Sequence, residues 1–276
     1  MAHIVLAHGF LGAGENPWLM GVDYFNGVAA MLRGRKHEVL ETSVSPLGSL
    51  DERSQQLARE INERWPGDFD LYVIAHSMGG LDARRVIARH EVGRRIKKLI
   101  TIATPHFGTP VANAVLDRVP AKIYECIPGP LLEYFNKDGG ALNDLRVRQS
   151  LHDPNCPWVD YMEVACVAPR SRLGSVLADF PIGSLLPEHL AGSLLFGLTR
   201  ALGDLSESSK SNDGLVTLES ARCPPREPIE EWLVDHGGAI GWPSNLFGVS
   251  TVRAVFSPSA DHLARYRALA ERLEQP

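Results

Sequence analysis

The sequence has few cysteines, and none stands at a metal-binding spacing from another. The four cysteines are Cys126, Cys156, Cys166 and Cys223. The close cysteine pairs of structural zinc sites are missing, so we expect no metal centre of that kind. So few thiols in a chain of 276 residues favour a reduced protein. A single disulfide, for instance between Cys156 and Cys223, is the alternative.

Long apolar runs and an excess of basic charge are missing as well. Residues 173–202 form a very apolar segment, but charged residues, a histidine and prolines interrupt it, so it does not predict a transmembrane helix. The formal net charge of −5 gives no basic surface of the kind that binds nucleic acid. With no internal repeat and with 44% apolar and 22% charged residues, the composition is that of one soluble globular domain.

A signal peptide is also missing, because Met1-Ala2 leads directly into the first apolar run. A cytoplasmic location is therefore the default expectation. The mature form of a secreted protein would look the same apart from its Met1, so secretion is kept as the alternative.

Strands and helices alternate over the first hundred residues. Apolar runs at residues 3–7, 37–42, 71–74 and 96–103 predict strands, and residues 23–33, 50–65 and 81–88 predict helices. Ser49 and Glu52 form a capping box that opens the second helix, and Pro66 ends it. This alternation predicts a mostly parallel sheet with helices on both faces.

The alternation ends after Pro105. Residues 161–167 predict a strand that returns to the sheet, and Ser259 caps a final amphipathic helix. Two interpretations fit the apolar residues 173–202, which hold Leu194, Leu195 and Phe196. They form either a pair of core helices or a mobile cap whose apolar face covers an apolar substrate cleft.

Ser77 lies where an expected strand turns into an expected helix, in the sequence Ala75-His76-Ser77-Met78-Gly79-Gly80. A serine at such a turn, with small residues two positions before and after it, is typical of a nucleophile elbow. Ala75 takes the first small position, where glycine is usual. We therefore predict that Ser77 is a nucleophile.

A nucleophilic serine needs a base and an acid that orients the base, in the order serine, acid, histidine for this kind of elbow. Asp213 stands in a loop signal, Asn212-Asp213-Gly214, which an ordinary turn would explain equally well. His236 follows an apolar run and precedes two glycines. We predict Asp213 as the acid and His236 as the base. The rival base is His262, which we expect to be a surface or capping residue at the start of the last helix.

Stabilising an oxyanion requires two backbone N–H donors. One should be the amide of Met78, directly after the nucleophile. The other should come from the Gly-rich loop after the first strand, where we place it at Phe10, with Leu11 as the near alternative. His76, next to the nucleophile, is expected to be a packing residue.

Taken together, these motifs make the chain resemble the true bacterial lipases of the α/β-hydrolase superfamily. The resemblance rests on His8–Gly12, Gly21–Val28, Ala75–Gly80, Thr101–Thr109, Asn212–Val216 and Val234–His236. Residues 3–112 look like the Pseudomonas–Burkholderia type. Ala75 and Thr101–Thr109 are similar to Bacillus-type lipases, and residues 113–205 match little.

The resemblance implies an α/β-hydrolase fold, one domain over residues 1–276, and an inserted helical cap at about residues 106–205. It implies hydrolysis of a carboxylic ester, of the triacylglycerol type, through an acyl-serine on Ser77. Leu11, Leu194, Leu195 and Phe196 would contact the acyl chain, and a lipid–water interface would be a transient partner. The alternatives are an esterase, thioesterase or polyester hydrolase for soluble acyl groups, or a non-catalytic binding protein.

Two departures from the relatives concern metals. Many of them bind calcium through an acidic residue shortly after the catalytic histidine, where this chain has Gly237-Gly238-Ala239-Ile240. We therefore expect that calcium site to be missing, with Asp204 or Asp235 as candidates for an altered one. The zinc-binding insertion of the Bacillus type is also missing, so no cofactor is expected.

Overall fold

The computed structural model describes residues 1–10, 23–110, 112–113, 116, 140–167, 211–223, 230–241 and 262–273. Most of the expected cap at residues 106–205 lies outside this part. The expected substrate contacts Leu11, Leu194, Leu195 and Phe196 lie outside it as well.

In the described part of the chain, six parallel strands form the central sheet, in the order β2-β1-β3-β4-β5-β6. They are β1 (His3–Ala7), β2 (Glu38–Glu41), β3 (Leu71–His76), β4 (Ile96–Ile102), β5 (Asp160–Cys166) and β6 (Glu230–Trp232). The first five confirm the expected strands, and β6 was not predicted. Because all pairs are parallel, the carboxyl ends of the strands meet at one edge of the sheet, where parallel sheets carry their sites.

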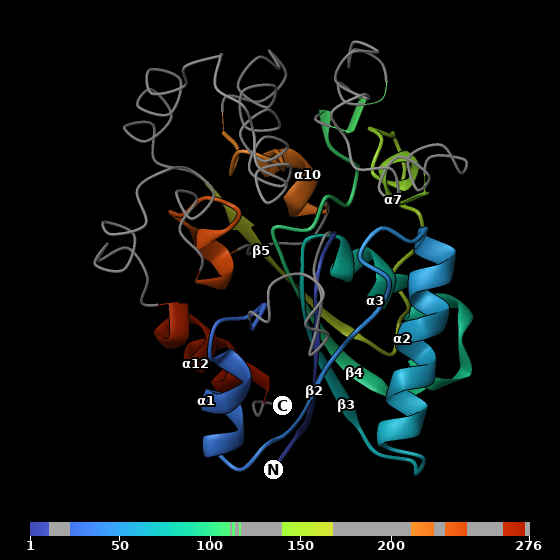
Figure 1. The fold of residues 1–276 in the computed structure, drawn as a ribbon, viewed down its shortest axis with the longest axis vertical. Helices are drawn as coiled ribbons and strands as arrows, with labels where there is room; N and C mark the ends of the chain where they lie inside the picture. Colours follow the sequence, from blue (N-terminus) through green and yellow to red (C-terminus); the bar gives the residue numbers. More distant parts are fainter. Residues whose placement is uncertain are drawn as a thin grey trace, which may run out of the picture.

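Helices cover both faces of this sheet, as predicted (Figure 1). The helices are α1 (Val28–Gly34), α2 (Leu50–Arg64), α3 (Met78–Arg89), α7 (Gly140–Asp144), α10 (Leu218–Arg222) and α12 (His262–Leu273), with 3-10 turns η2 (Glu91–Arg95) and η4 (Gly238–Ile240). In Figure 1, α1 and α12 lie on one face and α2 and α3 on the other. None of the helices in the described part is both long and apolar enough to cross a membrane.

Alternating side chains of the strands build two cores, one under each helical layer. Ile4 and Leu6 pack with α1 and α12, whereas Val5 and Ala7 pack with α2 and α3. Strands buried on both faces are expected to be continuously apolar, and β1 shows this with Ile4-Val5-Leu6-Ala7.

Helix boundaries differ from the sequence-based ones where local chemistry overrides the pattern. Ser49 caps α2 as predicted, since its Oγ accepts the Glu52 amide at 3.3 Å, and the helix ends at Arg64 with Trp65 as its C-cap. The first helix begins at Val28 rather than Asp23, because Gly27 has φ 85°, a left-handed conformation that a helix cannot contain. The helix after the elbow begins earlier than expected, at Met78.

The disulfide alternative for Cys156 and Cys223 is wrong. Both residues are buried and neither is part of a disulfide, and the same holds for Cys166. The Cys223 sulfur accepts a hydrogen bond from the Arg84 guanidinium at 3.1 Å, which gives this thiol a polar partner other than a second sulfur.

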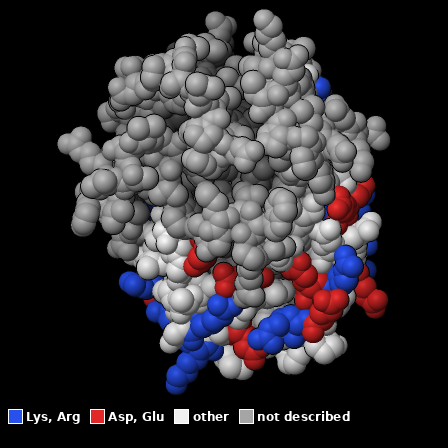
Figure 2. Space-filling model, in the orientation of Figure 1, with Lys and Arg blue, Asp and Glu red and all other residues white. Residues whose placement is uncertain are grey.

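Acidic and basic side chains are mixed on the described surface. On the face in Figure 2, red and blue side chains adjoin one another over the described part. Ion pairs such as Arg33–Glu41 at 2.9 Å and Arg64–Glu38 at 3.3 Å are examples of this mixing. The described part of that face therefore carries no patch of a single sign.

Candidate active site

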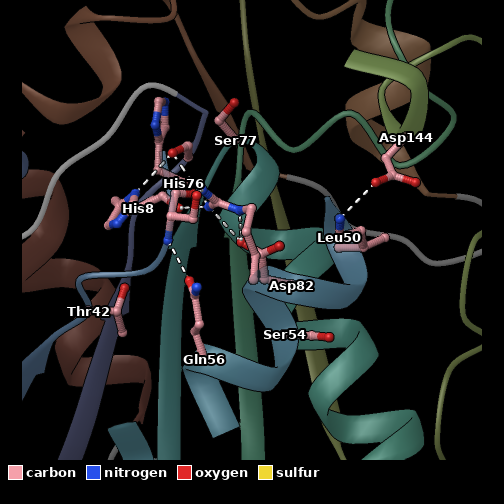
Figure 3. Close-up of polar contacts among 12 residues, drawn as sticks. His8, Thr42, Leu50, Ser54, Gln56, His76, Ser77, Asp82 and Asp144 are labelled. Atoms are coloured by element: carbon pink, nitrogen blue, oxygen red, sulfur yellow. Dashed lines mark hydrogen bonds and ion pairs between the residues drawn. The ribbon is translucent and has the colours of Figure 1, made fainter. Parts of the chain in front are cut away.

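Ser77 occupies a strained turn between β3 and α3. Its backbone has φ 56° and ψ −131°, a combination that residues other than glycine rarely adopt. Two hydrogen bonds hold the turn: the Ser77 amide donates to the Ile102 carbonyl at 2.9 Å, and the Thr104 hydroxyl donates to the Ser77 carbonyl at 2.8 Å. Figure 3 shows Ser77 at this turn, at the start of α3. The geometry is that of a nucleophile elbow.

Small residues after Ser77 are required by close packing. A Cβ on Gly79 would lie 2.4 Å from the Ala7 carbonyl oxygen, and a Cβ on Gly80 would lie 2.2 Å from Thr104 Oγ1. The end of β1 and the start of α3 thus approach each other backbone to backbone. This approach brings the segment after β1 against the nucleophile. A Cβ added at Gly9 would lie 2.6 Å from the Ser77 Cβ.

Asp213 and His236 form a buried pair. The Asp213 Oδ2 lies 2.7 Å from the His236 Nδ1, and Asp213 Oδ1 accepts the amides of Leu215 at 2.9 Å and Val216 at 2.7 Å. The His236 amide also donates to the Asp213 carbonyl at 3.0 Å. The carboxylate is therefore fixed by its own loop and presents one oxygen to the imidazole.

The pair lies beside the elbow. The His236 ring centroid is 4.6 Å from that of His76, which directly precedes Ser77. The structure thus brings Asp213 and His236 into contact. It also places His236 against His76, the residue directly before Ser77. His236 Nδ1 faces the carboxylate, so its Nε2 is left for the serine or a substrate, as a general base requires.

His262, the rival base, was misjudged as a surface or capping residue. It is buried, and its Nε2 donates to the Asn26 carbonyl at 2.8 Å. A Cβ on Gly241 would lie 2.5 Å from that ring. His262 therefore packs between α12, the turn before α1 and the end of η4.

A fully buried arginine anchors the loop after β1. The Arg53 Nη2 donates to the His8 carbonyl at 2.8 Å, Nη1 donates to the Ser45 carbonyl at 2.6 Å, and Nε donates to Asp82 Oδ2 at 2.9 Å. Asp82 lies on α3, so the Arg53 side chain ties α2 and α3 to the segment that precedes Phe10. Phe10 and Met78, the predicted oxyanion donors, both follow segments that touch Ser77. Leu11 lies outside the described residues.

Comparison with solved structures assigns this architecture. The lipase of Staphylococcus hyicus matches 99% of this chain and 95% of its own, with a TM-score of 0.65 and 18% identity. The fold is that of the α/β-hydrolases. The mature lipase BlEst2 of Bacillus licheniformis has the same α/β-hydrolase fold, with a TM-score of 0.56 and 20% identity over 89% of this chain and 88% of that one.

Sequence comparison finds further similarities. The model of a family described as the PGAP1-like alpha/beta domain matches residues 49–145. "Triacylglycerol lipase 2" of Saccharomyces cerevisiae is 32% identical over 250 residues. The match includes 83% of this chain, which spans 65% of the length of that relative.

One group of metal-ligand types occurs among the described residues of this chain. Ligand atoms of His106, Glu163 and Cys223 lie within 4.8 Å of one another, all buried. The Arg84 guanidinium already reaches two of them, at 3.4 Å from Glu163 Oε1 and 3.1 Å from Cys223 Sγ. This group therefore has a fixed cation of its own, which would repel a metal ion. Asp235, a candidate for an altered calcium site, accepts the Gly238 amide at 2.7 Å; Asp204 lies outside the described residues.

Burial keeps the histidines around Ser77 neutral. Burial and the nearby Arg53 charge lower the pKa of His8 to about 3. Burial, with His236 close by, holds the pKa of His76 well below its usual range, and burial raises the pKa of Tyr24. His8, His76 and Tyr24 are thus uncharged at neutral pH.

Sequence reasoning missed Arg53, Asp82 and Tyr24 as parts of this site, and it assigned His76 only to packing. One signal was present: Arg53 precedes Leu57 and Ile61 at four-residue spacing, so it lies on the buried stripe of α2. A charged residue in such a stripe indicates a buried ion pair or an anchored backbone. Nothing in the sequence pairs Tyr24 with His76.

Proposed function

We propose that this α/β-hydrolase is a serine carboxylic ester hydrolase that works through Ser77, His236 and Asp213. The observation that carries the proposal is the buried Asp213–His236 pair, held 2.7 Å apart beside the strained turn of Ser77. An ordinary turn would explain Asn-Asp-Gly alone, but it would not explain a carboxylate that is fixed by two amides and presented to an imidazole.

In this mechanism His236 Nε2 takes the Ser77 proton as Ser77 Oγ attacks the ester carbonyl. The amides of Phe10 and Met78 stabilise the oxyanion, and Asp213 stabilises the imidazolium that forms. His236 then gives the proton to the leaving alcohol, and an acyl-serine remains. A water molecule, activated by His236, hydrolyses the acyl-serine by the same steps in reverse. No step requires a metal or an organic cofactor.

Acyl glycerides are the proposed substrates. The printed name of the yeast relative, a triacylglycerol lipase, supports this class, and so do the lipases among the solved structures. An assignment to the Pseudomonas–Burkholderia type and a cap that holds Leu194, Leu195 and Phe196 against the acyl chain belong to the same proposal. An esterase for soluble acyl groups is the second candidate. A series of p-nitrophenyl esters from acetate to palmitate separates the two: a lipase gains kcat/KM with chain length above the aggregation limit of the substrate.

The serine mechanism is tested by Ser77→Ala with Ser54→Ala as the matched control. Ser54 is a buried serine on α2 whose hydroxyl, within the described residues, bonds the Asp51 carbonyl. Losing the nucleophile should lower kcat on p-nitrophenyl butyrate by about 10⁴–10⁶-fold and abolish labelling by a fluorophosphonate probe. Ser54→Ala should retain both. A loss of less than tenfold in purified Ser77→Ala would overturn the proposal.

A further inference from the structure

A line of three hydrogen bonds joins the loop after β1 to the backbone of His236. The Gly9 amide lies 3.0 Å from the Tyr24 hydroxyl, this hydroxyl lies 2.7 Å from His76 Nδ1, and His76 Nε2 lies 3.1 Å from the His236 carbonyl oxygen. The two ends of the line are the segment that precedes the proposed oxyanion donor Phe10 and the proposed base. Its middle member, His76, is buried and directly precedes Ser77.

The chemistry of the two ends fixes every proton in the line. The Gly9 amide can only donate, so the Tyr24 oxygen accepts from it. The His236 carbonyl can only accept, so His76 Nε2 carries a proton and donates it. His76 is neutral, because burial depresses its pKa, so Nδ1 is unprotonated and accepts the Tyr24 hydroxyl proton. No other arrangement satisfies all four groups.

This line holds His236 through a hydrogen bond that does not involve the Asp213 loop. The Asp213 carbonyl accepts the His236 amide and the Asp213 carboxylate accepts from the ring, but both bonds come from one loop. The His76 bond is different, because it ties the His236 carbonyl to the strand that carries Ser77. It therefore sets the position of the base relative to the nucleophile.

We propose that Tyr24 and His76 are positioning residues that align the oxyanion loop, the nucleophile and the base as one unit. The proposal rests on the proposed function of Ser77 and His236. His76 does not take a proton from the substrate; it fixes the His236 backbone, and Tyr24 fixes both the tautomer of His76 and the Gly9 amide. Misplacement of a catalytic group by about 1 Å can cost on the order of 10²-fold in rate, so loss of this alignment should lower kcat while KM stays nearly constant.

Two amide substitutions at His76 test its two ring nitrogens separately. In His76→Asn the side-chain oxygen takes the place of Nδ1 and still accepts from Tyr24, but nothing reaches the His236 carbonyl. In His76→Gln the longer amide places an N–H near the position of Nε2 and can donate to His236. We expect His76→Asn to lower kcat by about 10–100-fold with KM within about twofold, and His76→Gln to retain most of the activity. The downfield Nδ1 proton resonance of His236 should shift or broaden in His76→Asn and be closer to wild type in His76→Gln.

Tyr24→Phe tests the other end, with Tyr266→Phe as control. Tyr266 is a buried tyrosine whose hydroxyl has no hydrogen-bond partner among the described residues. Tyr24→Phe should lower kcat by about tenfold or more, and Tyr266→Phe should leave it unchanged. Equal kcat in His76→Asn and His76→Gln, or wild-type kcat in Tyr24→Phe, would overturn the positioning role. If Ser77→Ala also stays active, the proposed function itself fails; if Ser77→Ala is inactive, only the positioning role fails.

Discussion

At Gly79 the backbone of the elbow passes so close to the end of β1 that no side chain fits. A Cβ there would lie 2.4 Å from the Ala7 oxygen and 2.7 Å from the His8 oxygen, and the latter is held by Arg53. We expect Gly79→Ala to lower the free energy of unfolding by about 1–3 kcal/mol. Because the loop that leads to Phe10 must shift, kcat on p-nitrophenyl butyrate should fall as well.

The matched control is Gly34→Ala at the end of α1. A Cβ there would have no neighbour within 4 Å, so stability and activity should be unchanged or slightly improved. Urea denaturation and steady-state assays of both variants test the close approach of Gly79 to the end of β1. Wild-type stability and kcat in Gly79→Ala would contradict it.

His236 and His262 have different contacts, so we expect one variant to lose activity and the other to lose stability. His236 bonds the Asp213 carboxylate, whereas His262 bonds only the Asn26 carbonyl among the described residues. His236→Ala should lower kcat about as much as Ser77→Ala, and the double variant should lose little more, because the two act as a unit. His262→Ala should lower the free energy of unfolding by about 1–3 kcal/mol and leave kcat of the folded protein nearly unchanged. The reverse pattern would assign the base to His262.

Among the elements, α2, α3 and the loop after β1 are joined by the Arg53–Asp82 pair. Arg53→Met leaves the Asp82 carboxyl buried without its partner, which for such pairs costs about 3–5 kcal/mol. Adding Asp82→Leu removes the unpaired carboxyl, and we expect the double variant to recover much of that loss. Neither variant can hold the His8 carbonyl, so kcat should be low in both. Recovery of kcat in the double variant would show that the pair stabilises the fold without positioning the loop.

Among the helices and strands, the sequence predicted those that depend on local patterns. Apolar runs located β1 to β5, the capping box located the start of α2, and Ser77 marked the elbow. The start of α1 was wrong, because Gly27 forces a left-handed turn at a position where the apolar pattern already runs. The three-residue strand β6 was missed, since so short a strand is defined by its pairing with β5 rather than by its own residues.

Residue type and chain order were enough to select Asp213 and His236, which the structure places in contact, and their catalytic roles stay a prediction. The surroundings that hold these residues were not predictable. Tyr24 and His76 lie 52 residues apart, and His76 and His236 lie 160 apart. A hydrogen bond over such a separation depends on the packing of the sheet, which leaves no periodicity in the sequence.

For the whole molecule, three buried histidines predict acid lability. Burial lowers the pKa of His8 to about 3 and keeps the pKa values of His76 and His106 well below the usual range. Each has a pKa near 6.5 when unfolded, so below pH 6.5 the unfolded chain binds more protons than the folded one. The free energy of unfolding should therefore fall as the pH drops, by about 3 kcal/mol for the three between pH 6.5 and 5.5, and their contribution should be flat above pH 7.5.

Urea denaturation at pH 7.5, 6.5 and 5.5 measures this loss. His8→Asn supplies the comparison, because the asparagine amide can still donate to the Gly9 carbonyl but does not titrate. Its pH dependence should be weaker than that of the wild type by about a third. Constant stability of the wild type from pH 7.5 to 5.5 would contradict the assignment of these histidines as neutral.

The order of the strands along the chain also sets when the proposed triad can exist. Ser77 follows β3, whereas His236 follows β6, the last of the described strands along the chain. A ribosome adds about 5–20 residues per second, so the base is synthesised roughly 10–30 s after the nucleophile. The emerging chain therefore carries a complete elbow without a base to activate it. The proposed base joins the site only after β6 has been made and has paired with β5, so the finished elbow waits for the last of the described strands.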